Sequence, residues 1–421
     1  MTAASDTEDL EPQKIAVDKA EEQSGSGLLF GLSAGHGVKH FAQGSFLILM
    51  PDIRTALSLS DIAVGGMFTA QQIASGFANI PAGFMTDFFR RQLPIILFSA
   101  MSLVGLGYLL VGFTDWYWLL LIAAVIIGIG TSMWHAPAFG ALAARYPKRR
   151  GFAMAAHLTG AQIGNTTAPV IVGVALAGFT IGALNWDGLE WRTVSILLIL
   201  PTMATAFAVL FLFRNPPGTD SVPPDLQSYF AASRKLVTNY RVLSLVGLQA
   251  IRGAVHQSFQ IFLVLYLSEE LDYDAWLVGL HISLITLAGI GSTPLMGIVS
   301  DRIGRKPVIV GAMAVTGILL AQFLWIESGF PLAIALTFLG LVLFAVMPII
   351  AAAAMDQTEK GSEGSSIALM FAGGAAIGAS APIAAGAINS VWGFHGVVWF
   401  CVAIAATGTV LSLIVPMRRS A

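Results

Sequence analysis

The sequence predicts an all-α integral membrane protein in which twelve transmembrane helices form two parallel six-helix bundles. The 421-residue chain is 56% hydrophobic and only 11% charged, and its mean hydropathy is +0.77. Soluble domains carry roughly 25% charged residues. Apolar runs of spanning length, about 20 residues, recur along the chain, and the second half repeats features of the first. The net charge of −2 is uninformative, because in a membrane protein the position of the charges matters.

Polar or turn-rich breaks separate the predicted spans. The spans lie near residues 30–51, 62–86, 93–113, 117–144, 152–178, 191–213, 241–267, 275–299, 307–326, 331–354, 364–389 and 393–416. The expected domains are a disordered acidic tail at 1–27, a first bundle at 28–214, a linker at 215–240, a second bundle at 241–417 and a short tail at 418–421. Residues 1–27 lack the basic start and apolar core of a cleavable signal peptide.

Basic residues predict the orientation, because Lys and Arg accumulate in short cytoplasmic loops. Cations gather in alternate loops, among them Arg90, Arg145, Arg149, Arg234 and Arg305. The opposite loops hold Arg54, Arg192 and an acidic run from Glu269 to Asp274. We therefore expect both termini and the linker on the cytoplasmic side of a multi-pass protein of the plasma (inner) membrane.

A charged motif at the ends of the second and eighth spans marks the duplication. The intact copy reads Gly297-Ile-Val-Ser-Asp301-Arg302-Ile-Gly304-Arg305-Lys306, and the weaker copy reads Gly83-Phe-Met-Thr-Asp87-Phe-Phe-Arg90-Arg91-Gln92. A carboxylate followed by several cations suits a helix end at a cytoplasmic membrane surface. We expect this gating motif to link helix ends when the cytoplasmic side is closed. The alternative is that its cations fix topology alone.

Twelve spans in two parallel repeats with this loop signature resemble the major facilitator superfamily. The first half is also similar to the fosmidomycin-resistance-like group in the segments Gly31–His40, Gly128–His135 and Arg150–His157. The resemblance implies a secondary transporter that works by alternating access. The chain departs from that group where Lys39-His40 replaces an Asn-Asp pair and where His135-Ala136-Pro137 replaces His-Pro-Glu. Both departures remove a carboxylate, so that group's proton coupling and substrate are not carried over.

Two polar stripes form the candidate substrate site, since residues three and four apart share a helix face. The stripes are His36, Lys39, His40 and Gln43 in the first span, and Gln249, Arg252, His256 and Gln260 in the seventh. The resemblance implies that both line a central cavity. A cavity with cations and no carboxylate at membrane depth favours an anion, which Arg252 would bind through paired hydrogen bonds and Lys39 as a point charge. The alternative is that these groups bind backbone carbonyls or reach toward the interface.

Histidine titrates near neutrality, so histidines within spans are the candidates for a coupled proton. They are His36, His40, His256 and His281. Each one has the alternative of a purely structural bond to a neighbouring helix. His36 and His40 also have the i, i+4 spacing of metal ligands. The local sequence offers no third ligand, and Lys39 would repel a cation, so we predict no metal and no cofactor.

Small residues and proline allow close helix packing in the fifth and eleventh spans. The packing motif comprises Gly164, Pro169, Gly173 and Pro382. Its fifth-span part resembles an element of antiporter-type exporters and so favours export. The element recurs in the eleventh span. Helix packing that both halves share is therefore an alternative explanation of nearly equal weight to export.

The sequence thus predicts a transporter that moves a small organic anion, with proton-linked export favoured over import or exchange. No HExxH or P-loop motif occurs and no catalytic residue is assigned, so we predict no enzyme. A channel has no need of duplicated gating motifs, and a non-transporting receptor of the same fold is the remaining alternative. We expect a monomer in the lipid bilayer that binds a small solute and protons and no nucleic acid.

Overall fold

The structure is a computed structural model that describes residues 10–146, 149–182, 184–213, 225–358 and 363–417. Its first half contains α1 (Leu10–Ile48), α2 (Met50–Ala56), α3 (Asp61–Phe88), η1 (Arg90–Gln92), α4 (Leu93–Phe113), α5 (Tyr117–Met133), α6 (His135–Arg145), α7 (Arg150–Ala177), β1 (Phe179–Ile181), β2 (Leu184–Trp186), α8 (Trp191–Leu197) and α9 (Ile199–Leu212). The connecting helix is α10 (Leu226–Thr238). The second half contains α11 (Tyr240–Leu265), η2 (Tyr266–Glu270), α12 (Ala275–Ile303), α13 (Arg305–Ala321), η3 (Gln322–Leu324), α14 (Gly329–Leu343), α15 (Val346–Met355), α16 (Glu363–Gly378) and α17 (Ala381–Ile414).

Every predicted span coincides with a helix or with consecutive helices. By length and composition, seven helical segments of the described residues are apolar enough to cross a membrane. One of them, Ala368–Ile414, covers two predicted spans and bends at Gly393, whose φ is 62°. The remaining predicted spans are α1, α3, α7 and α11, which are less apolar because they carry the polar stripes and many small residues. The helices are therefore consistent with twelve spans.

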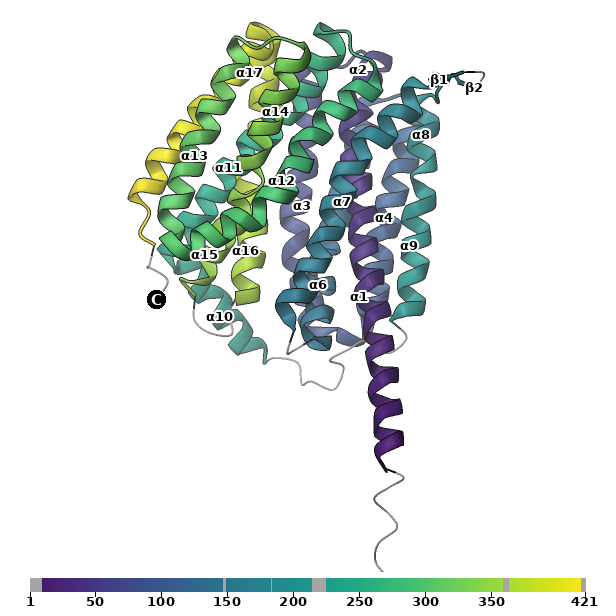
Figure 1. The fold of residues 1–421 in the computed structure, drawn as a ribbon, viewed down its shortest axis with the longest axis vertical. Helices are drawn as coiled ribbons and strands as arrows, with labels where there is room; N and C mark the ends of the chain where they lie inside the picture. Colours follow the sequence, from purple (N-terminus) through teal and green to yellow (C-terminus); the bar gives the residue numbers. More distant parts are fainter. Residues whose placement is uncertain (1–9, 147–148, 183, 214–224, 359–362, 418–421) are drawn as a thin grey trace, which may run out of the picture.

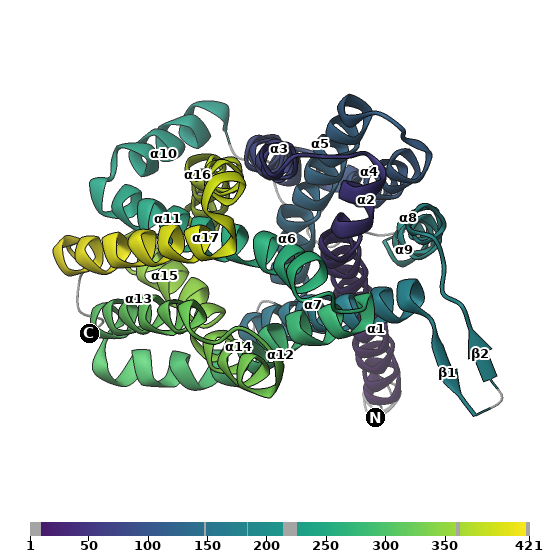
Figure 2. The ribbon, with the colours of Figure 1, turned by 90° about the horizontal axis from the view of Figure 1, so that it is seen from above.

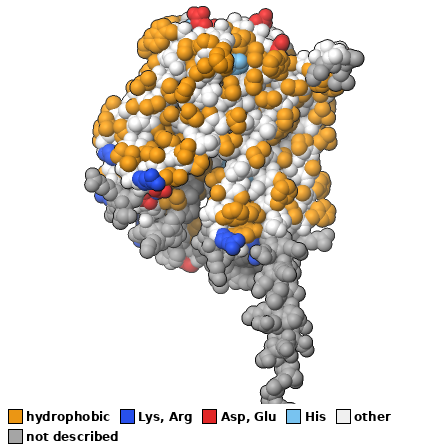
Figure 3. Space-filling model, in the orientation of Figure 1, with side chains coloured by type: hydrophobic (Ala, Val, Ile, Leu, Met, Phe, Trp, Pro, Cys, Tyr) orange, Lys and Arg blue, Asp and Glu red, His pale blue; other side chains and the backbone are white. Residues whose placement is uncertain are grey.

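The two halves form separate bundles that lie side by side (Figures 1 and 2). Between them α7 packs along α12, and α3 packs against α16 and α17. Large hydrophobic side chains, such as Ile122, Phe207 and Ile318, are exposed on the outer faces of the bundles. Figure 3 shows this hydrophobic surface between an end with acidic side chains and an end with Lys and Arg. We call these the acidic end, defined by Glu269, Glu270, Asp272 and Asp274, and the basic end, defined by Arg90, Arg91, Arg302, Arg305 and Lys306.

The bundles are closed against each other at the acidic end and part toward the basic end. One hydrophobic core cluster joins both halves and includes Phe46 and Met67 of the first half and Leu263 and Val278 of the second. The two other clusters lie toward the basic end, and each contains residues of one half only. Figure 3 shows the surface hollowed between the halves toward the basic end. The described chain therefore has an arrangement that is open at the basic end.

Glycine contacts explain the tight closure at the acidic end. A Cβ atom at Gly279 of α12 would overlap the carbonyl oxygen of Pro169 in α7, and one at Gly65 of α3 would overlap that of Pro382 in α17. Gly173 meets Ala275 in the same way. The predicted packing residues Pro169, Gly173 and Pro382 thus lie at contacts between the bundles, where the missing Cβ atoms let backbones touch.

Three local features differ from a simple reading of the sequence. The loop after the fifth span forms a hairpin in which Phe179 lies opposite Trp186. The connection predicted as a polar linker contains α10, whose Tyr229 packs on Phe84 and Phe88 of α3. Helix α1 begins at Leu10, within the stretch predicted as a tail. Residues 1–9 and 214–224 and the predicted tail at 418–421 lie outside the described residues.

Candidate functional site

A polar cluster forms where α1 meets α7. Their backbones touch because a Cβ atom at Gly160 would overlap the carbonyl oxygen of Ser33, and one at Gly164 would overlap that of Gly37. This contact brings the polar stripe of the first span against the fifth span. His36 and His157 consequently stack with their ring centroids 4.0 Å apart. The predicted packing residue Gly164 therefore positions the candidate site.

A second approach to the cluster comes from the fourth span, which is broken at Trp134 between α5 and α6. Pro137 has no backbone N–H, so it cannot bond the carbonyl four residues earlier, and the helix restarts at His135. This start points His135 at the first span, where its Nε2 lies 3.0 Å from Lys39 Nζ. The break thus supplies an imidazole to the cluster.

Lys39 lies at the centre of the cluster and is only 3% exposed. Its Nζ lies 3.3 Å from His40 Nε2 as well as close to His135. His40 Nδ1 donates to Asn165 Oδ1 at 3.1 Å. His36 Nδ1 donates to the carbonyl oxygen of His157 at 2.9 Å. The cluster is therefore a buried lysine surrounded by imidazoles from three helices.

The cluster also touches the other bundle. The ring of His135 stacks on that of Phe371 of α16, with centroids 5.8 Å apart and planes inclined by 5°. Both side chains are half-buried. If the two bundles moved relative to each other, these two rings would separate. The contact therefore links the polar cluster of the first bundle to the position of the second bundle.

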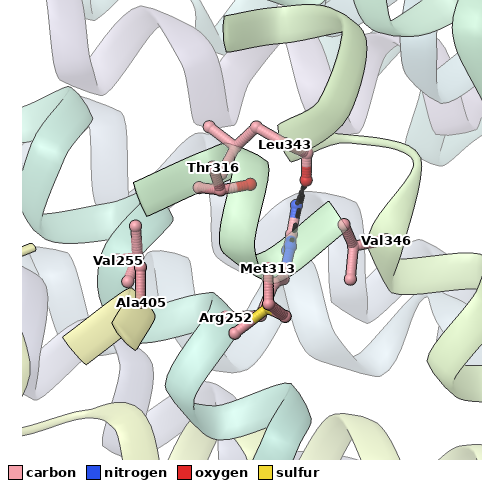
Figure 4. A pocket seen from close by; sticks show the side chains of 7 residues that line it. All are labelled: Arg252, Val255, Met313, Thr316, Leu343, Val346 and Ala405. Carbon is pink, nitrogen blue, oxygen red and sulfur yellow. Dashed lines mark hydrogen bonds between the residues drawn. The ribbon is translucent and has the colours of Figure 1, made fainter. Parts of the chain in front are cut away.

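The second predicted stripe lies in a different environment. Arg252 donates to the carbonyl oxygen of Leu343 from Nε at 3.3 Å and from an Nη atom at 3.0 Å (Figure 4). Leu343 ends α14, at the break in the tenth span that precedes Pro348. Arg252 faces a small cavity lined mainly by apolar side chains of α11, α13, α15 and α17. In this arrangement its guanidinium satisfies a carbonyl that the helix break exposes.

The remaining predicted site residues are more dispersed. His256 lies edge-on to Phe344 at 5.0 Å, and its Nε2 has no hydrogen-bond partner among the described residues. His281 Nδ1 donates to the carbonyl oxygen of Leu277 in its own helix at 2.8 Å. Gln43 and Gln260 are half-buried on their stripes. The structure thus groups His36, Lys39 and His40 tightly and places His281 apart.

The sequence stripe missed the partners that come from elsewhere in the chain, namely His135, His157, Asn165 and Phe371. The proline after His135 is the signal that could have identified it, because a helix break in a membrane exposes polar groups. The ring nitrogens of His36, His40 and His135 lie within 4.8 Å of one another. His135 thus supplies the third imidazole that the local sequence lacked, but Lys39 Nζ occupies the ring nitrogens Nε2 of His40 and His135, and the carbonyl of His157 occupies Nδ1 of His36. The residues therefore fit a metal poorly.

The gating motif forms a charge network at the basic end. Arg305 pairs with Asp301, donates to Ser300 Oγ at 3.1 Å and lies 3.4 Å from Asp356 Oδ2 at the end of α15. All of these groups belong to the second half. Gly304, whose φ is 97°, makes the turn that places Arg305 there, since positive φ favours glycine.

The other motif residues surround this network and its weaker copy. Arg302 is exposed and Lys306 half-buried at the basic end. A Cβ atom at Gly83 or Gly297 would meet no heavy atom within 4 Å. Arg91 is exposed. Burial raises the pKa of Asp87, while Arg90 opposes that rise. The first copy therefore has a partly buried carboxylate near α10.

Asp301→Asn is expected to lower the maximal transport rate roughly tenfold, equal to about 1.4 kcal/mol in barrier height. The substitution removes one of the two carboxylates beside Arg305, and we expect this network to exchange partners when the basic end closes. Substrate affinity should stay nearly constant, because the motif lies outside the cluster. Transport kinetics in proteoliposomes measure both quantities. Asp274→Asn, at the other end of α12, is the control. An unchanged rate in Asp301→Asn would assign the motif to topology alone.

An ion-pair network joins the two halves at the acidic end. Arg54 of α2 lies 2.8 Å from Asp61 Oδ1 and 2.5 Å from Glu269 Oε2. Arg54 and Asp61 belong to the first half, and Glu269 to the second. Burial raises the pKa of Glu269, and this effect outweighs the lowering effect of Arg54; the charge of Asp61 raises the pKa further. The network therefore joins the two bundles at the closed end.

The Glu269 carboxyl should make this closure depend on pH. Its raised pKa means that the closed end binds the proton more tightly than an open end with a solvated Glu269. The closed state of the acidic end should therefore become more stable as the pH falls through the range in which Glu269 takes up a proton, and less stable as the pH rises. Pulsed spin-label distances between Thr55→Cys and Ser328→Cys, in a Cys401→Ala background, measure the fraction of molecules in which the acidic end is closed. Glu269→Gln should abolish this dependence and Glu270→Gln retain it. A response in the opposite direction would contradict the expectation.

The fold and site define a class: an integral membrane transporter built from two bundles around a buried polar site. The sequence model of the Major Facilitator Superfamily matches residues 32–293 and 245–421. The chain belongs to this superfamily. It is therefore a secondary transporter of a small solute and not an enzyme.

Individual relatives agree with this assignment. The chain is 22% identical to the fosmidomycin resistance protein of Escherichia coli over 306 residues, which cover 72% of this chain and 73% of the relative. It is 22% identical to a putative metabolite transport protein of Haemophilus influenzae over 381 residues, 87% of this chain and 90% of the relative. A bacterial homolog of the human lysosomal transporter Spinster, in an inward-facing and unoccupied conformation, has the same fold. Its TM-score is 0.72 at 16% identity, over 93% of this chain and 95% of that one. The predicted superfamily and its fosmidomycin-resistance-like group are confirmed.

Proposed function

We propose that this chain moves a small organic anion across the plasma (inner) membrane by alternating access, with proton-linked export as its direction. One observation carries the proposal: Lys39 is buried at membrane depth among imidazoles, and no carboxylate lies in the described cluster. A charge in such a place is costly unless it is paired. A bound carboxylate or phosphonate would supply the missing anion.

The second stripe supports an anion from the other bundle. Arg252 is 8% exposed and lacks a carboxylate among the partners described for it. Its hydrogen bonds to Leu343 hold the guanidinium in place, and its charge adds to the positive potential of the interior. We therefore assign His36, Lys39, His40 and Gln43 to the primary binding site and Arg252, His256 and Gln260 to its opposite wall.

Proton linkage and export rest on different arguments. His36 and His40 belong to the cluster and His256 belongs to the opposite wall, and an imidazole is a group that can carry a coupled proton. His281 is the weakest candidate, because it bonds to its own helix. Export is supported by the name of a relative, a fosmidomycin resistance protein. Import or exchange of the same anion is the alternative.

The proposed cycle uses the two ends as alternate gates. Because basic residues favour the cytoplasm, we assign the basic end and both termini to that side and the described arrangement to an inward-open state. Closure would bring the basic ends of the bundles together around the Asp301 and Arg305 network, while the Arg54 and Glu269 network opens. Residues 28–214 and 241–417 would move as the two bundles, joined by the linker 215–240.

Proteoliposomes test the proposed function. Purified protein is assayed for uptake and counterflow of phosphonates, sugar phosphates, carboxylates and neutral drugs, with and without a pH gradient. We expect anions to move and the pH gradient to change their net flux. Transport of neutral or cationic solutes alone would overturn the anion assignment. Binding without movement of any ligand would indicate a receptor instead.

A further inference from the structure

Lys39 differs from an ordinary substrate-binding lysine in its hydrogen bonds. Asn165 Oδ1 can only accept, so His40 Nδ1 carries a proton and donates to it at 3.1 Å. In the neutral ring, His40 Nε2 is therefore an acceptor, 3.3 Å from Lys39 Nζ. His135 Nε2 lies 3.0 Å from the same atom. Two of the three N–H donors of a charged Lys39 thus face neutral imidazoles, and the third can face a ligand.

The ionisable groups around Lys39 come from several helices. His36 and His40 lie on its own helix, His135 on α6 and His157 on α7. Other helices that touch α1 carry ionisable side chains that bond to backbone carbonyls. Tyr108 of α4 donates to the carbonyl of Ala42, and Tyr117 of α5 donates to that of Ala63. Arg252 of α11 donates to the carbonyl of Leu343, and His281 of α12 donates to that of Leu277. These side chains include no carboxylate, so the described surroundings of Lys39 do not compensate a positive charge.

A lone ammonium in this position has two low-energy states. It can lose its proton, which removes the cost of burying an unpaired charge. Alternatively, it can stay charged when a bound anion pairs with it. Anion binding and proton binding at Lys39 therefore favour each other, and this linkage is reciprocal.

We propose that Lys39 is the proton carrier of the transport cycle and that one proton crosses with each bound monoanion in the same direction. This inference rests on the proposed function and narrows its proton linkage from the histidines to one amine. In the loaded carrier a charged Lys39 faces the anion, and in the empty carrier a neutral Lys39 remains. The Lys39 cluster itself carries no net charge in either form, so it does not oppose reorientation across the membrane.

His135 provides a route for the proton. Its Nε2 accepts from Lys39, and its Nδ1 has no hydrogen-bond partner among the described residues. When Lys39 passes its proton to Nε2, the ring can release the other proton from Nδ1, which is buried in this arrangement, to water that enters when the site opens. The amine then becomes neutral and the ring stays neutral in its other tautomer. Net direction follows the combined gradients of anion and proton, so an acid that accumulates in the cytoplasm leaves together with its proton.

Single-molecule energy transfer tests Lys39 without a cargo. Dyes at Phe89→Cys and Ile303→Cys, exposed positions at the basic end of each half, report reorientation in a background that carries Cys401→Ala and also Glu269→Gln, which removes the pH response of the acidic end. In the empty wild-type carrier the rate should rise about tenfold per pH unit while Lys39 loses its proton. Lys39→Met should be fast and independent of pH. Lys39→Arg should be slow at every pH, because arginine keeps its charge.

Two results of this experiment would overturn the assignment. The first is the same pH dependence in Lys39→Met as in wild type, which would place the titrating group elsewhere. The second is a wild-type rate that does not change with pH, which would describe a permanently charged lysine. If Lys39→Arg does not fold, the comparison of wild type with Lys39→Met decides.

Flux measurements test the co-transport. Proteoliposomes with an internal pH dye receive external methanesulfonate or methylphosphonate. Wild type should acidify the interior as the anion enters, whereas Lys39→Arg should exchange labelled anion without acidification. Anion flux without acidification in wild type overturns the co-transport. Absence of anion flux together with Lys39-dependent reorientation would instead refute the proposed anion cargo and retain Lys39 as the proton site.

Discussion

Lys39→Met is expected to reduce anion transport to background while leaving a folded protein in the membrane. The substitution keeps a long flexible side chain and removes only the charge and the hydrogen-bond donors. Loss of one partner from a buried charged pair costs roughly 3 kcal/mol, or about a hundredfold in affinity. The thermal midpoint should stay the same or rise, since replacing a buried charge by an apolar group is often neutral or stabilising.

Counterflow in proteoliposomes and a thermal melt in detergent check both halves of this prediction. Lys235→Met is the charge-matched control, because Lys235 is an exposed cation on α10 outside the cluster. It should transport like wild type. Full transport by a well-folded Lys39→Met variant would remove Lys39 from the binding site.

Gly279→Leu is expected to abolish transport by keeping the acidic end open. A Cβ atom there would overlap the carbonyl oxygen of Pro169, and neither backbone can move without separating α7 from α12. Overpacking at such a contact costs about 3 kcal/mol, enough to shift the closed population roughly a hundredfold. The same helix offers a control in Gly291, which is exposed and has no heavy atom within 4 Å of a Cβ position.

Pulsed spin-label distances at the acidic end and transport assays measure the effect. The Thr55→Cys and Ser328→Cys pair should report a longer distance in Gly279→Leu and an unchanged distance in Gly291→Leu. An acidic end that remains closed in Gly279→Leu would show that the contact between α7 and α12 does not determine closure.

The sequence predicted the fold well because its signals are local. Apolar runs located the helices, the repeated charged motif revealed the duplication, and Pro137 and Pro348 correspond to the two broken spans. The hairpin at Phe179–Trp186 depends on pairing within a short loop that carries no strong hydrophobic alternation. Helix α10 was read as polar linker because, with 13 residues, it is too short to cross a membrane.

The candidate site was only partly predictable. The stripe of His36, Lys39 and His40 follows from helix periodicity alone. Its partners His135 and Asn165 reach it through the break before Pro137 and the glycine contact at Gly164, and neither distance can be obtained from spacing along the chain. Arg252 was selected by its charge, whereas its bond to Leu343 depends on a helix break in another span.

The most direct test of the central claim is counterflow of one solute skeleton in two charge states. Phosphonoacetate is compared with its uncharged triester in wild type and Lys39→Met, in the same proteoliposomes at the same pH. An anion carrier centred on Lys39 should exchange the phosphonate in wild type, exchange it at background rate in Lys39→Met, and ignore the triester in both. Equal movement of the triester, or undiminished phosphonate exchange without Lys39, would contradict the claim.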